Sequence, residues 1–185
     1  MIILGVDPGT LITGYGIIES FNGRVKVLAC DAIKNPSNTP MPARLNLIFN
    51  TLTQLIRKFH PDEFAIETAF YGKNAQSALK LGHARGVAML AAVKHHLDTH
   101  EYSPREVKRA IVGNGNASKI QVQYMIGSML KLSEKPKLFD TTDALAVAIC
   151  HLHRAGSRTT TVKSWKAYLS AHPEKLAKTP WRPRG

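Results

Sequence analysis

The sequence predicts an α/β fold in which helices flank a mixed sheet. Three short runs rich in apolar and β-branched residues open the chain, and Asn22-Gly23 joins the second run to the third as a strong hairpin signal. Beyond about residue 42, helical and strand patterns alternate. Because early strands followed by alternating elements are typical of a layered fold, we expect an antiparallel three-strand meander with further strands beside it.

The strands of the expected meander cover residues 2–6, 15–19 and 25–33. The first is a short, mostly apolar run, which suits a buried strand. Between it and the second strand lies the segment DPGTLITGYG, in which Pro8, Gly9, Gly14 and Gly16 are expected to mark a turn and a close approach of backbone.

The later segments show helical and strand patterns in turn. Capping signals at Ser103, Glu106 and Ser118 mark two helix starts. After residue 156 the sequence loses clear periodicity. The predicted elements are a helix at 42–60, a strand at 64–67, a helix at 75–97, a strand at 99–102, a helix beginning at 104, a helix from about 119 to 132, and a helix opened by Asp140.

The charge distribution points to a polyanionic partner. The chain has 25 Lys and Arg against 13 Asp and Glu, a net charge of +12. From His151 to Gly185 there are 8 basic residues and 1 acidic residue, so over half of the excess lies near the C-terminus. Such a protein attracts nucleic acid first and anionic membrane second. We expect one domain over residues 1–155 and a basic extension over 156–185, which could be flexible and merely solvated.

The cysteines and the apolar segments favour a cytoplasmic protein. Cys30 and Cys150 lie in apolar runs, where buried free thiols are expected, and two cysteines do not make a disulfide framework. The start, MIILGVDPG, lacks the charged segment of a signal peptide. The longest apolar stretches, 87–93 and 144–150, are too short to cross a bilayer, so no membrane partner is expected.

Four carboxylates occupy positions that suit a metal site. Asp7 ends the first strand, Glu67 ends the strand at 64–67, and Asp140 and Asp143 share a face at a helix start. Converging acids repel one another without a cation, magnesium prefers oxygen ligands, and two ions about 3.5–4 Å apart favour phosphodiester hydrolysis. Each acid alone could instead cap a turn or helix, or be solvated, so the metal site depends on all four meeting in space.

Four groups of motifs follow one another along the chain. They are ILGVDPGT followed by TGYG, FAIE followed by KNAQSALKLG and ARG, PREVKRAIVGNGNASKIQVQ, and a D-x-x-D pair followed by ALAVAI. With these motifs the sequence resembles the RuvC family of Holliday junction resolvases. These motifs run in order over residues 1–153, and the long middle motif is highly specific. The extension beyond His153, with Trp165 and Trp181, fits no part of the family pattern.

The resemblance implies a ribonuclease-H-like fold and a Mg²⁺-dependent endonuclease with two ions per site, in which Mn²⁺ can substitute. It implies a homodimer that resolves four-way DNA junctions by paired symmetric nicks in recombination and repair, with RuvA and RuvB as branch-migration partners. By position, the catalytic and metal-binding acids are Asp7, Glu67, Asp140 and Asp143.

The resemblance also implies residues that contact DNA. Lys108 and Lys119 match basic residues that support DNA binding or cleavage, and Phe70 matches an aromatic placed to stack on a base. The chemistry of the residues also supports DNA contact here. Phe70 and Tyr71 are expected to share a loop with Lys73, and an aromatic ring beside a cation can bind unstacked nucleotides. One of the two rings is expected to pack under the loop instead.

The residue patterns alone are also compatible with three other functions. D-x-G-T after a strand also occurs in the phosphate loop of sugar kinases and actin-like ATPases, although those folds need a second such domain. A non-catalytic DNA-junction binding module would share the basic surface, although all four acids are present. Another nuclease of the same fold, acting on RNA, would share the acids.

Overall fold

The structure, a computed structural model, describes residues 1–68, 75–132 and 139–158. The chain divides into two compact units, Met1–His153 and Arg154–Gly185. The strands and helices of the described residues belong to the first unit, except that the last helix continues into the second. In the described part of the chain, no helix combines the length and the apolar character needed to cross a bilayer.

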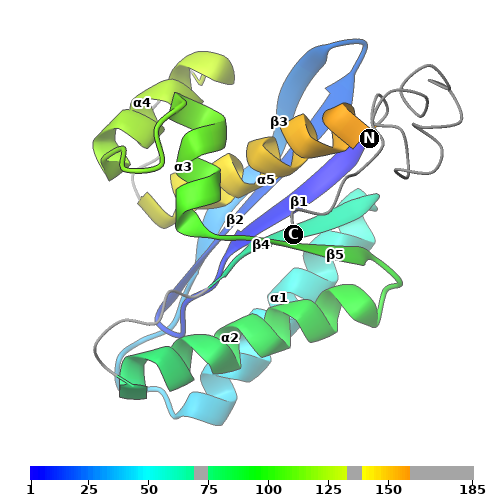
Figure 1. Cartoon of the computed structure of the whole chain (residues 1–185). Helices are drawn as coiled ribbons and strands as arrows, with labels where there is room; N and C mark the ends of the chain where they lie inside the picture. Colours follow the sequence, from blue (N-terminus) through cyan, green and yellow to red (C-terminus); the bar gives the residue numbers. More distant parts are fainter. Residues whose placement is uncertain (69–74, 133–138, 159–185) are drawn as a thin grey trace, which may run out of the picture. The chain divides into compact units, whose positions relative to one another are not determined.

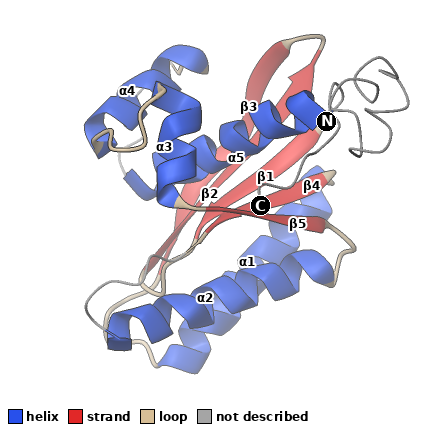
Figure 2. Ribbon diagram, in the orientation of Figure 1, coloured by secondary structure: helices blue, strands red, loops and turns tan. Residues whose placement is uncertain are grey.

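A five-stranded mixed sheet forms the centre of the first unit, with strand order β3-β2-β1-β4-β5 (Figures 1 and 2). The first three strands pair antiparallel, which is the predicted meander, and β4 and β5 extend the sheet parallel to β1. Asn22 and Gly23 both adopt positive φ, as a tight hairpin turn requires. The strands are β1 (Ile2–Asp7), β2 (Ile12–Phe21), β3 (Arg24–Lys34), β4 (Glu63–Glu67) and β5 (Asp98–Tyr102).

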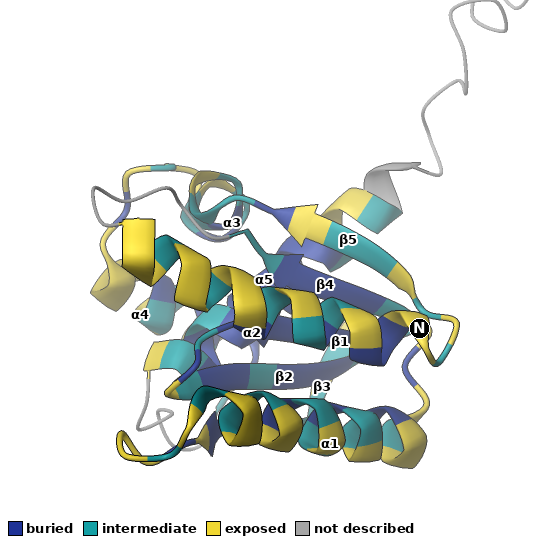
Figure 3. Ribbon diagram, turned by 90° about the horizontal axis from the view of Figure 1, so that it is seen from below, coloured by how far each residue is buried: buried dark blue, intermediate teal, exposed yellow. Residues whose placement is uncertain are grey.

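Helices cover both faces of this sheet. Figure 1 shows α1 and α2 on one face and α5 lying along the other, with α3 and α4 beside it. Each face has its own apolar core, and Figure 3 shows the exposed residues of α1 on the side away from the strands. The helices are α1 (Met41–Phe59), α2 (Ala75–Val93), α3 (Pro104–Val112), α4 (Lys119–Met129) and α5 (Phe139–Arg158). The predicted α/β fold with a mixed sheet is confirmed.

Glycines in the sheet allow α5 to lie directly on the strands. A Cβ at Gly5 would lie 2.3 Å from the carbonyl oxygen of Ala144, and a Cβ at Gly14 would lie 2.0 Å from that of Asp140. Gly16 lies beneath the same helix. The expected turn at Gly14 and Gly16 is wrong because both lie within β2, whereas the expected close approach of backbone is confirmed.

Several element boundaries differ from those predicted. β2 begins at Ile12 rather than residue 15 because its pairing with β3 extends to Lys34. α2 ends at Val93 rather than residue 97, and α4 ends at Met129 rather than near 132. Left-handed backbone follows each of these two ends, at His96 (φ 59°) and at Lys131 (φ 48°).

The predicted helix starts and free thiols are confirmed. Ser103 and Glu106 form a reciprocal capping box at the start of α3, and Ser118 caps α4. Cys150 is a buried free thiol, whereas Cys30 is free but only half-buried.

Candidate active site

Asp7 and Glu67 lie at the same edge of the sheet. Each is the last residue of its strand, and β1 and β4 run parallel with Val6 opposite Ile66. Parallel strands place their carboxyl ends at one edge, so residues far apart in sequence converge there. The two carboxyl groups are close enough to share a hydrogen bond.

The start of α5 brings Asp140 and Asp143 to this edge. Asp140 lies in the first turn of the helix, and its carbonyl lies over Gly14, which pairs with Asp7 in the sheet. Asp143 lies near enough for its charge to raise the pKa of both Asp7 and Glu67. The four acids singled out from the sequence are therefore neighbours in the fold.

The acids oppose one another's ionisation. Burial is the largest influence on Asp7, and the charges of Glu67, Asp143 and Asp140 add to it, so that the pKa of Asp7 rises to about 9. Burial also raises the pKa of Glu67, although a hydrogen bond from Asp7 favours its ionised form. A bound cation removes such repulsion and favours the ionised carboxylates, so the cluster has the chemistry of a metal site.

Lys119, the first residue of α4, contacts the acids directly. Its Nζ donates a hydrogen bond to Asp143 Oδ2 at 2.8 Å. Burial alone would lower the pKa of Lys119, but this hydrogen bond and the charges of Asp143, Asp7 and Asp140 outweigh it and raise the pKa. The ammonium group therefore stays charged and holds one acid in place.

A cleft of about 170 Å³ opens beside the acids. Acidic residues, two lysines and an apolar wall share its lining, so it can hold a phosphodiester between positive charge and carboxylates. Lys108 of α3 is one of these lysines, and its charge lowers the pKa of Glu67. The lining residues are Glu67, Pro104, Val107, Lys108, Lys119, Val122 and Asp143.

The predicted DNA-contacting residues divide into two pairs. Lys108 and Lys119 lie at the cleft. Phe70 and Lys73 lie outside the described residues. The apolar wall of the cleft could not be predicted from the sequence, because helical periodicity marks positions such as Val107 and Val122 only as inward-facing.

A mixed sheet with an antiparallel meander, helices on both faces and carboxylates gathered at one edge defines a nuclease of the ribonuclease-H-like class. The family model of crossover junction endodeoxyribonuclease RuvC matches residues 3–151. RuvC of Shewanella baltica is 50% identical over 156 residues, which cover 84% of this chain and 89% of the relative. RuvC of Chloroherpeton thalassium is 42% identical over 186 residues, which cover 96% and 100%. The chain belongs to the RuvC family of crossover junction endodeoxyribonucleases.

Solved structures agree with this assignment. Thermus thermophilus RuvC in complex with a Holliday junction substrate superposes with a TM-score of 0.81 at 29% identity, covering 86% of this chain and 97% of that one. The yeast mitochondrial Holliday junction resolvase Ydc2, at 12% identity and a TM-score of 0.58 over 86% of each chain, shares the fold. The predicted family, fold and nuclease class are confirmed, and the kinase or ATPase alternative is wrong.

Proposed function

We propose that this endonuclease resolves four-way DNA junctions with Asp7, Glu67, Asp140 and Asp143 as its catalytic acids. The observation that carries the proposal is the convergence of the four carboxyl groups at one edge of the sheet, where they oppose one another's ionisation. Ionising such a cluster is costly unless a divalent cation binds there. The junction bound by the similar Thermus thermophilus protein supports the choice of substrate.

The ligand set fits magnesium. All four side chains offer carboxylate oxygens, which Mg²⁺ prefers, and it binds through a few such groups while keeping several waters. Four acids suffice for two ions, and Mn²⁺ accepts the same oxygens. When bound, the ions would polarise the scissile phosphate and lower the pKa of an attacking water.

The chain's own residues hold the reacting groups in place. Asp7 lies within range of the charges of the other three acids, so together they would hold the metal when it is bound. Lys119 fixes the carboxylate of Asp143, and Lys108 adds positive charge on the same cleft. Together the two lysines offer contacts to phosphate oxygens, which position DNA without reading its sequence.

The loop after Glu67 is our candidate for opening the junction. It carries Phe70 and Lys73, and stacking of a base on an aromatic ring is worth about 1–3 kcal/mol. Support for both residues comes from their place in the sequence directly after a catalytic acid. We assign the basic extension at 156–185 to further phosphate contacts, which would make binding more sensitive to salt.

An apolar stripe on α2 supports a homodimer. Leu79, Leu90 and Val93 are 67%, 52% and 58% exposed, and spacings of three and four residues place them on one face with Gly82 and Gly86. A Cβ at either glycine would meet nothing within 4 Å, which leaves room for a second helix. Two copies packed through this stripe about a two-fold axis would present two acid clusters to the two strands cut in a junction.

The cellular setting of the proposal follows the resemblance to the family. RuvA and RuvB are the proposed branch-migration partners, and the cytoplasm is the proposed location. The free thiols at Cys30 and Cys150 are consistent with a reducing compartment. The proposed DNA substrate is consistent with the same location.

A comparison of substrates tests this function. Full-length protein in Mg²⁺ is given a labelled mobile four-way junction, a linear duplex of the same sequence and an RNA–DNA hybrid. Paired symmetric nicks in the junction, with little cutting of the other two, would support the proposal. Equal cutting of the linear duplex would leave a nuclease without branch specificity. Tight junction binding without cutting, in Mg²⁺ and in Mn²⁺, would leave a binding module.

A further inference from the structure

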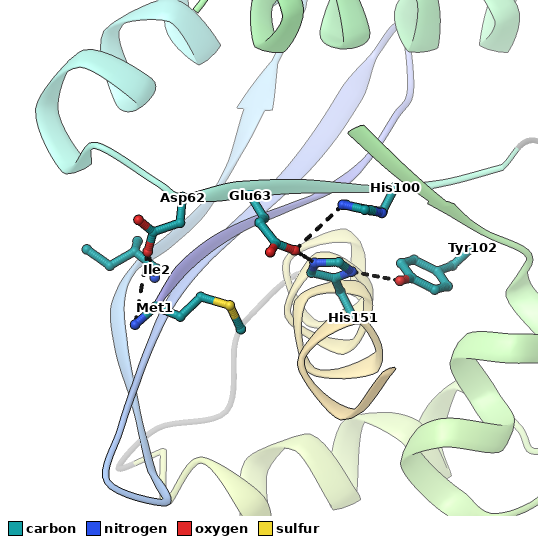
Figure 4. Close-up of polar contacts among 7 residues, drawn as sticks. All are labelled: Met1, Ile2, Asp62, Glu63, His100, Tyr102 and His151. Carbon is teal, nitrogen blue, oxygen red and sulfur yellow. Dashed lines mark hydrogen bonds and ion pairs between the residues drawn. The ribbon is translucent and has the colours of Figure 1, made fainter. Parts of the chain in front are cut away.

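A second group of metal-ligand side chains lies at the opposite end of β4 from Glu67. Glu63 is the first residue of β4, His100 lies in β5, and His151 lies in α5. Figure 4 shows the Glu63 carboxylate facing both imidazole rings, with Tyr102 on the far side of His151. The group therefore brings together three elements at a position separate from the acid cluster.

The ligand atoms of this group are close to metal-binding spacing. His151 Nε2 contacts Glu63 Oε2, and His100 Nε2 lies 3.6 Å from the same oxygen. One ligand atom from each residue lies within 4.8 Å of the other two. Zinc bonds of about 2.0–2.1 Å in tetrahedral geometry separate ligand atoms by roughly 3.3–3.4 Å. A small withdrawal of the Glu63 side chain would admit an ion.

A hydrogen bond outside the group orients one ligand. Tyr102 Oη lies 2.7 Å from Nδ1 of His151, so that Nε2 is the ring atom directed at Glu63. Such a bond fixes the tautomer and orientation of a metal-bound histidine. The His100 and His151 rings stack with centroids 4.4 Å apart, so both imidazoles lie beside the same Glu63 carboxylate.

The group is closed on one side and open on the other. The side chain of His151 is 1% exposed, whereas those of Glu63 and His100 are 29% and 21% exposed. An ion can therefore reach the site from solvent, and a water can complete its coordination.

We propose that Glu63, His100 and His151 bind a divalent cation of the zinc class. Two imidazole nitrogens and one carboxylate suit Zn²⁺, whereas the all-carboxylate cluster suits Mg²⁺. The ion would join β4, β5 and α5 about 12 Å along the helix axis from Asp143. Because β4 also carries Glu67 and α5 carries Asp140 and Asp143, the ion would brace two of the three elements that hold the proposed catalytic acids.

Metal titration of the full-length protein tests this site. Zn²⁺ is titrated against a competing chromophoric chelator for the wild type, His100→Gln, Glu63→Gln, Tyr102→Phe and Asp7→Asn. His83→Gln is the matched control, because His83 is an exposed histidine on α2. Co²⁺ serves as a spectroscopic probe, since a low-coordinate site with nitrogen ligands absorbs visible light more strongly than an octahedral all-oxygen site. Melting curves without metal establish that each variant is folded.

We expect the wild type, Asp7→Asn and His83→Gln to bind one equivalent of Zn²⁺ and to melt at higher temperature with it. His100→Gln and Glu63→Gln should bind Zn²⁺ at least about a hundredfold more weakly, and Tyr102→Phe about 10–100-fold more weakly. Zinc binding by His100→Gln with the affinity of the wild type would overturn the proposal. Loss of the bound zinc in Asp7→Asn, or no binding by the wild type, would overturn it equally.

Discussion

Gly14 lies directly beneath the first turn of α5, where a Cβ would be only 2.0 Å from the carbonyl oxygen of Asp140. Gly14 also pairs with Asp7 across the sheet. Because β2 has no side chain at this position, α5 can lie directly against it. Asp140 and Asp143 of α5 are thereby brought close to Asp7 on the neighbouring strand β1. The contact between helix and sheet therefore also sets the spacing of the acids.

Gly14→Ala should destabilise the protein and abolish cleavage. Its methyl group would push α5 away from β2, and overpacking of this kind costs about 1–3 kcal/mol or more. Gly127→Ala in α4 is the control, because a Cβ there meets nothing within 4 Å and alanine favours a helix by about 0.5–1 kcal/mol. Urea unfolding and junction cleavage measure both effects. Wild-type stability and activity in Gly14→Ala would contradict the proposed role of this contact.

Asp7→Asn should stabilise the metal-free protein. The pKa of Asp7 in the folded protein is about 9, against an ordinary value of 3.8. Protonated Asp7 therefore stabilises the folded state fully only below about pH 4, and this stabilisation is lost as the pH rises through the folded pKa. In EDTA, the wild type should lose stability relative to Asp7→Asn between pH 5 and pH 9. Mg²⁺ should favour the wild type, because it binds the folded state through Asp7. Melting temperatures across this range test the prediction, and parallel curves for the two proteins would refute it.

Lys119→Met should weaken catalysis without unfolding the protein. Removing the hydrogen bond at 2.8 Å frees the carboxylate of Asp143, and loss of a partner that orients a metal ligand costs about 10–100-fold in metal affinity or activity. Cleavage rates over a range of Mg²⁺ concentrations measure the loss. Lys26→Met, at an exposed position of β3, should cut at the wild-type rate. If both variants lose the same activity, net charge rather than the contact with Asp143 is responsible.

Leu90→Lys should convert the proposed dimer to a monomer. Leu90 is 52% exposed and belongs to the apolar stripe on α2, and a charge there would oppose packing of two copies. Sedimentation velocity reports the state of assembly, and the monomer should produce unpaired nicks. Leu47→Lys on α1, at a residue that is 41% exposed, is the matched control and should stay dimeric. A dimeric Leu90→Lys protein would place the interface elsewhere.

Much of the fold follows from local patterns in the sequence. The turn at Asn22-Gly23 and the caps at Ser103 and Ser118 depend on neighbouring residues, so the sequence predicts them directly. Gly14 and Gly16 were predicted less well, because glycine serves both turns and close contacts, and only the position of α5 distinguishes the two uses.

Clusters assembled from distant elements are harder to predict. The four acids could be predicted because Asp7 and Glu67 end strands, Asp140 and Asp143 lie near the start of a helix, and all four fall within motifs of the family. The group of Glu63, His100 and His151 has no such signal, since its members come from three elements and meet only through the pairing of β4 with β5 and the packing of α5. The spacing of these three residues along the chain does not predict that they lie close together in the fold.

The most direct test of the active site is cleavage of a labelled four-way junction by the wild type and by Asp7→Asn, with junction binding measured for both proteins. We expect the wild type to make paired nicks only when Mg²⁺ is present. Asp7→Asn should bind the junction with comparable affinity and leave it uncut. Cleavage by Asp7→Asn at the wild-type rate, or cleavage by the wild type in EDTA, would show that the cluster of four acids is not the catalytic site.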